Sequence, residues 1–74
     1  MQYVILSTTG YRTSDFRVSK YFSDAQILNS RDEVIEFAEA ADCEEDELVI
    51  DANAHCLRGT VSDFSFRKSQ KRHA

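Results

Sequence analysis

One segment limits the folds open to this chain more than any other: a capped, amphipathic helix that begins near residue 30. Ser30 and Glu33 occupy the N-cap and N3 positions of a capping box, in which each side chain satisfies a backbone N–H at the helix start. Apolar side chains then recur at helical spacing, at Val34, Phe37, Ala38 and Ala41. The sequence therefore predicts a helix from Arg31 to about Asp42 with one apolar face to bury.

Short runs of β-branched and aromatic residues flank this helix, and such runs predict strands. The predicted strands are Gln2–Ser7, Phe16–Phe22, Leu48–Ile50 and Cys56–Phe66. Gly10 marks a turn or loop between the first two strands, and residues 51–54 suit another turn. Residues 23–29 are compatible with a short helical turn or with an extended segment.

The order of two strands, a helix and two strands favours an α+β domain. One antiparallel sheet of about four strands would carry the helix on one face, which is the simplest way to bury both apolar surfaces. The predicted core combines Val34, Phe37, Ala38 and Ala41 of the helix with Val4, Leu6, Phe16, Val18, Val49 and Phe64 of the sheet. Seventy-four residues suffice for a single domain, which we expect at residues 1–66, followed by a basic, frayed tail at residues 67–74.

The cysteine content and the N-terminus bear on the cellular compartment. Two cysteines, Cys43 and Cys56, are too few to indicate a secreted disulfide framework. The N-terminal apolar run is only four residues long and lacks a basic flank, so it is neither a signal peptide nor a membrane span. We therefore expect a cytoplasmic protein with reduced thiols and no membrane partner.

Residues that could carry catalysis or bind a metal are few and poorly spaced. The cysteines and histidines are Cys43, His55, Cys56 and His73, whereas a zinc site needs about four such ligands at close spacing. His55 and Cys56 are adjacent, so on a strand they would point to opposite faces and form no nucleophile–base pair. We expect Cys56 to be buried in its strand and His55 to be exposed in a turn. The sequence thus predicts no enzyme, no cofactor and no metal site.

Phosphate-binding and calcium-binding loops also lack their defining residues. Gly10 and Gly59 are the two glycines of the chain, and their isolation excludes a Walker loop or a dinucleotide fingerprint. The acidic run at residues 42–47 has neither the ligand spacing nor the glycine of a calcium loop.

Acidic residues are concentrated on the predicted helix and on the loop that follows it. Ten of the thirteen acids lie between Asp32 and Asp51, a stretch that contains no lysine or arginine. A solvated helix face is the simpler interpretation, but like charges four residues apart destabilise a helix, so a one-signed stretch suggests a use. The predicted partner-binding face comprises Asp32, Glu33, Glu36, Glu39, Asp42, Glu44, Glu45, Asp46 and Glu47.

Basic and aromatic residues elsewhere define an alternative function, nucleic-acid binding on a sheet face and the tail. The residues for this alternative are Arg17, Lys20, Tyr21, Arg67 and Lys68. Because the net charge is −4 and the acidic stretch would repel phosphate, we do not expect direct nucleic-acid binding.

In size, acidic charge and sheet-plus-helix pattern, the chain resembles the small inhibitors that phages and other mobile elements make, such as anti-CRISPR proteins. The resemblance implies stoichiometric binding without turnover to a host protein or ribonucleoprotein complex in the host cytoplasm. Its acidic helix face would dock on a basic groove and compete with phosphates as a nucleic-acid mimic. The resemblance rests on no sequence motif, so it assigns no residue. The inhibitor itself could be a monomer or a homodimer.

Overall fold

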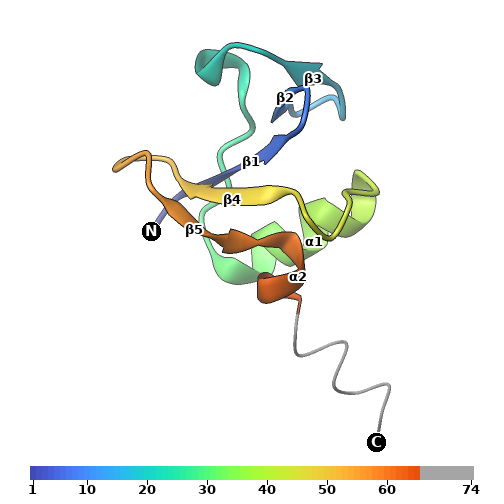
Figure 1. The fold of residues 1–74 in the computed structure, drawn as a ribbon, viewed down its shortest axis with the longest axis vertical. Helices are drawn as coiled ribbons and strands as arrows, with labels where there is room; N and C mark the ends of the chain where they lie inside the picture. The colour runs from blue at the N-terminus through green and yellow to red at the C-terminus, as the bar shows by residue number, and fades with distance from the viewer. Residues whose placement is uncertain (66–74) are drawn as a thin grey trace, which may run out of the picture.

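The sheet of this protein is antiparallel throughout, and its five strands lie in the order β3-β2-β1-β4-β5 (Figure 1). The computed structural model describes residues 1–65. Its strands are β1 (Tyr3–Ser7), β2 (Gly10–Arg12), β3 (Val18–Ser19), β4 (Leu48–Asp51) and β5 (Leu57–Thr60). Its helices are the main helix α1 (Arg31–Ala40), the short helix α2 (Val61–Phe64) and the 3-10 turn η1 (Phe22–Asp24). The predicted α+β class is confirmed, but the sheet has five strands and a second helix follows β5.

The start of α1 follows the predicted capping chemistry with one change. The Ser30 hydroxyl accepts a hydrogen bond from the backbone N–H of Glu33 at 3.1 Å. The Glu33 carboxylate accepts from the N–H of Asn29 at 3.0 Å, one residue before the expected partner. The helix ends at Ala40 because Asp42 adopts a left-handed conformation with a φ of 55°.

The hydrophobic core lies between α1, α2 and one face of the sheet. Ile5 of β1 and Val49 of β4 point toward α1, where they meet the buried Val34 and Ala38. The core also contains Leu28 and the two apolar side chains of α2, Val61 and Phe64. We call this side of the sheet the helix-covered face.

The predicted strand Phe16–Phe22 is wrong except at Val18–Ser19. Thr13 organises a turn in its place: its carbonyl accepts from the N–H of Phe16, and its hydroxyl accepts from the N–H of Arg17. Phe16 lies in this turn with a φ of 63°, and its side chain is 53% exposed. The two predicted core residues Phe16 and Val18 are therefore both exposed.

The predicted turn at Gly10 begins strand β2 instead. Gly10 has a φ of 149°, and a Cβ there would lie 2.5 Å from the carbonyl oxygen of Ser19. Only glycine allows β2 and β3 to approach this closely. A three-residue strand with such a start carries no alternating apolar pattern, which explains why the sequence did not reveal it.

The predicted strand Cys56–Phe66 contains β5 and then turns into α2. Thr60 and Asp63 form a complete capping box: the Thr60 hydroxyl accepts from the Asp63 N–H, and the Asp63 carboxylate accepts from the Thr60 N–H. Arg31 then holds α2 against α1, because its guanidinium donates to the Asp63 carbonyl at 2.9 Å and covers the Phe64 ring at 4.6 Å. Phe66 and the predicted tail at residues 67–74 lie outside the described residues.

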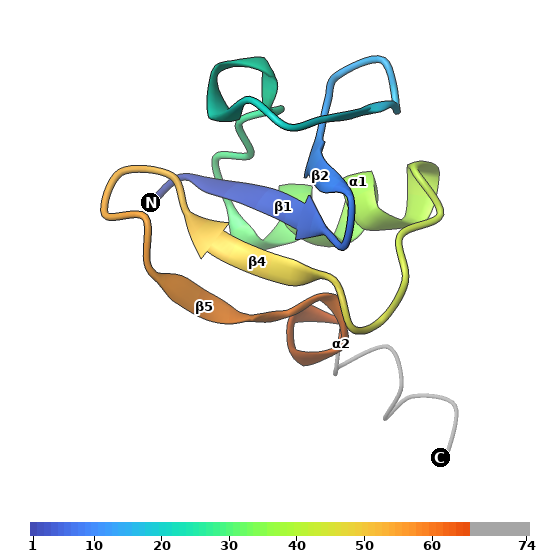
Figure 2. The same cartoon turned by 45° about the horizontal axis from the view of Figure 1, so that its top comes forward.

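The opposite face of the sheet carries a second apolar layer. Val4 is fully buried but does not belong to the helix-side core. Two ring contacts lie on this side: Phe22 of η1 packs edge-on against Tyr11 at 5.5 Å and meets the His55 ring at 4.5 Å with the planes tilted by 31°. Figure 2 shows η1 at one end of the sheet and α1 behind β1 and β4.

Candidate partner-binding surface

Eight of the nine carboxylates predicted to bind a partner are exposed on α1 and on the loop after it. They are Asp32, Glu33, Glu36, Glu39, Asp42, Glu44, Glu45 and Asp46, and we call this set the acidic surface. Since Val34 and Ala38 face the sheet, the helix directs Asp32, Glu36 and Glu39 away from it.

The described part of the chain is more strongly negative than the net charge of the whole chain suggests. All thirteen acids but only five of the nine lysines and arginines fall in residues 1–65, so the formal charge of this part is −8. Arg31 is the one cation among residues 31–47, and its guanidinium is engaged with α2. The acidic surface therefore creates a strong negative potential on one side of the molecule.

Glu47 does not belong to this surface, contrary to the sequence prediction. Its side chain is 4% exposed and forms a two-pronged ion pair with Arg12 of β2. The Arg12 Nε–Glu47 Oε1 distance is 2.9 Å, and the Arg12 Nη2–Glu47 Oε2 distance is 2.6 Å. The chain enters β4 directly after Glu47, so the Glu47 side chain lies beneath the loop and does not reach solvent.

The protonation behaviour of this buried cluster follows from its contacts. Burial raises the pKa of Glu47, but hydrogen bonds from Arg12 and from the Glu44 N–H outweigh it and leave the pKa below its ordinary value. The hydrogen bond with Glu47 raises the pKa of Arg12. Burial, followed by the charge of Glu47, raises the pKa of Cys43 to about 11, so its thiol is neutral at pH 7.

Backbone hydrogen bonds hold the acidic loop at both ends. At its start, the Cys43 N–H donates to the Ala38 carbonyl at 2.9 Å. In its middle, the Glu44 N–H donates to Glu47 Oε2 at 2.8 Å. At its end, the Glu45 carbonyl accepts from the N–H of Ser62 at 3.0 Å. The loop backbone is therefore tied to α1, to α2 and to the buried ion pair. These ties fix the backbone positions from which the exposed carboxylates project.

The alternative nucleic-acid-binding residues are brought together only in part. Arg17 is 83% exposed at its side chain and lies 3.5 Å from Asp15, while Lys20 lies over the Tyr21 ring at 5.8 Å. Tyr21 is 61% exposed. Because β3 is only two residues long, these side chains do not line one continuous sheet face. Arg67 and Lys68 lie outside the described residues.

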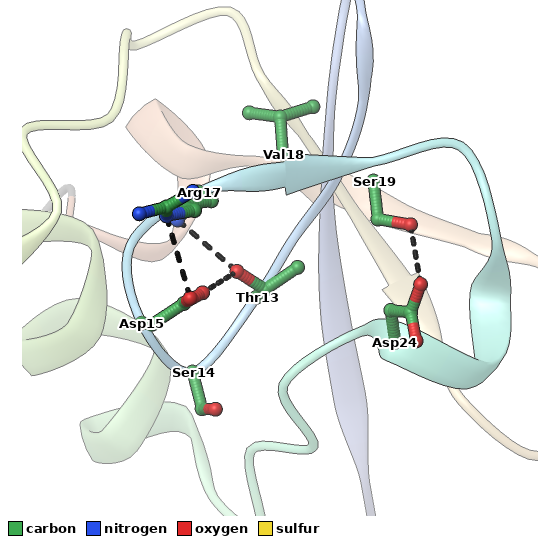
Figure 3. A pocket seen from close by; sticks show the side chains of 7 residues that line it. All are labelled: Thr13, Ser14, Asp15, Arg17, Val18, Ser19 and Asp24. Carbon is green, nitrogen blue, oxygen red and sulfur yellow. Dashed lines mark hydrogen bonds and ion pairs between the residues drawn. The ribbon is translucent and has the colours of Figure 1, made fainter.

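A shallow pocket of about 360 Å³ lies beside the loop between β2 and β3 (Figure 3). Its polar side chains bond to one another: Thr13 donates to Asp15, and Ser19 donates to Asp24 at 2.6 Å. Arg17 reaches Asp15 from the same loop. These pairings fix the local backbone, which is a sufficient structural explanation for the polar lining.

The remaining candidate side chains are placed as follows. Cys56 is exposed just before β5, so the prediction that it is buried is wrong. His55 is exposed as predicted, directly after the turn at residues 52–54. Asp51 ends β4, and its carboxylate accepts from the N–H groups of Asn53 and Ala54, both at 2.8 Å. These bonds lower the pKa of Asp51. Within residues 1–65, no three His, Cys, Asp or Glu side chains converge as metal ligands would.

The Arg12–Glu47 pair is the main feature that the sequence did not reveal. The two residues are 35 positions apart, so no local pattern connects them. The one local signal is the position of Glu47 immediately before the apolar run Leu48–Ile50, where the chain becomes buried.

Comparison with known proteins gives no match to this chain among family models, curated proteins or solved structures. Across the described part of the chain, none of the helices has the length and apolar character needed to cross a membrane.

Proposed function

We propose that this protein is a non-enzymatic binding module whose acidic surface docks on a basic, nucleic-acid-binding groove of a host protein complex, as a phage-type inhibitor does. One observation carries the proposal. Eight exposed carboxylates lie on one helix and its following loop, in a part of the chain with a formal charge of −8.

An ordinary solvated surface explains this arrangement less well. Asp32 and Glu36 are four residues apart on α1, where like charges destabilise a helix by a few tenths of a kcal/mol. A solvated helix normally intersperses lysines, which would relieve that repulsion. The loop that continues the acidic surface is also anchored through a buried ion pair rather than left to move.

The mechanism follows from electrostatics. A negative surface steers a positively charged groove toward itself and raises the association rate, an effect that salt weakens. Carboxylates held on a fixed backbone can take the positions that phosphates would occupy in the groove. The protein would then exclude the nucleic acid by competition and would need no chemical step.

Charge reversal with a matched control tests the proposal. The Glu36→Lys/Glu45→Lys variant changes the net charge by +4 on the acidic surface, and the Asp15→Lys/Asp24→Lys variant makes the same change near β3. Each protein is immobilised and used to capture binding partners from a lysate of the source cell, and bound proteins are then challenged with a short DNA duplex. Circular dichroism confirms that both variants fold.

We expect the acidic-surface variant to lose partners that the control retains, and DNA to release those partners from the unmodified protein. If both variants and the unmodified protein capture the same partners, and neither salt nor DNA affects capture, the acidic surface is not the binding site.

Nucleic-acid binding near β3 remains a second candidate function, because Tyr21 is an exposed aromatic ring with Lys20 above it and Arg17 on the same edge of the sheet. Aromatic rings beside cations suit the stacking of unpaired bases. Gel shifts with single-stranded and duplex probes at low salt test this candidate, and the absence of any retardation would eliminate it.

A further inference from the structure

We draw no further inference here: the strongest candidate, the surface patch around β3 where the exposed Phe16 and Tyr21 rings flank Arg17 and Lys20 in the sequence, overlaps the second candidate site already described, and nothing in the described part of the chain shows what covers it.

Discussion

Two short polar loops of this protein, residues 41–47 after α1 and residues 13–17 between β2 and β3, are held by different means. Both contain a non-glycine residue with positive φ, Asp42 and Phe16, and both carry exposed carboxylates. The first loop is tied to a buried ion pair between distant residues and to the backbone of α2. The second is held by backbone bonds between Thr13 and both Phe16 and Arg17 and by bonds to the Thr13 hydroxyl, and the Phe16 ring lies 5.6 Å from the Phe37 ring of α1. The first loop therefore rests on a buried ion pair, whereas the polar contacts of the second loop stay within the loop itself.

The contrast explains why we assign function to the first loop. An exposed ion pair such as Arg17–Asp15 adds little stability, whereas breaking a buried pair leaves an uncompensated charge. Holding a charged surface in place before binding reduces the ordering that binding must impose. The acidic loop has this anchoring, and the loop between β2 and β3 does not.

Among the variants that test this contrast, removal of the Glu47 carboxylate should lower the stability of the fold most. Glu47→Ala leaves the Arg12 guanidinium, which is 16% exposed, without its partner and should lower the free energy of unfolding by about 3 kcal/mol or more. Urea denaturation followed by circular dichroism measures the change. Because the domain is small, this variant could be largely unfolded.

The double variant Arg12→Met/Glu47→Leu addresses that outcome. It removes both charges and should recover much of the lost stability. A Glu47→Ala variant as stable as the unmodified protein would show that the ion pair does not anchor the loop.

The Arg12–Glu47 pair should also make stability depend on pH, with a somewhat smaller change in the free energy of unfolding. The pKa of Glu47 is lower in the folded chain than its ordinary value of 4.5. Its contribution to stability is therefore complete above about pH 4.5 and is lost as the pH falls through the folded value. The free energy of unfolding should fall more steeply below pH 4.5 in the unmodified protein than in Glu47→Gln. Parallel pH profiles for the two proteins would contradict this prediction, since Asp15 and Asp51 titrate in both.

Removing the cap of α1 should have an intermediate effect of about 1 kcal/mol. In Ser30→Ala, the Glu33 N–H loses its side-chain acceptor, so the first turn of the helix that carries the acidic surface frays. Ser23→Ala, at an exposed position in η1, serves as the control. Equal denaturation midpoints for the two variants would argue against a stabilising role for the Ser30 hydroxyl.

The smallest effect is expected in the loop between β2 and β3. Asp15→Ala removes an exposed ion pair and a bond to Thr13, and it should leave the denaturation midpoint unchanged within error. A loss of stability comparable to that of Glu47→Ala would break the contrast between the two loops.

The elements that the sequence predicts well are those defined by local signals. The Ser30 cap and the spacing of Val34 and Ala38 predict the start of α1 correctly and place its end about two residues beyond Ala40, and the apolar runs predict β1 and β4. The capping box at Thr60 and Asp63 is equally local, but the predicted strand Cys56–Phe66 runs through it, so the prediction misses α2.

The features that the sequence does not predict depend on contacts between distant residues. Strand β3 can pair with β2 because Gly10 leaves room for the Ser19 carbonyl, and Glu47 is absent from the acidic surface because it forms a buried ion pair with Arg12. Neither contact has a sequence pattern of its own. The exposure of the eight carboxylates of the acidic surface was predictable because charged side chains on the outer face of a helix and on a surface loop project into solvent.

Native-state amide hydrogen exchange measured by NMR tests the central contrast most directly. The Cys43, Glu44 and Glu47 N–H groups of the anchored loop should exchange about tenfold more slowly, or slower still, than the Phe16 and Arg17 N–H groups, after correction for intrinsic rates. All five are hydrogen bonded, so the difference reports anchoring rather than bonding alone. In Glu47→Gln, the difference should shrink. Equal protection of the two loops in the unmodified protein, or stronger protection of residues 13–17, would contradict the account.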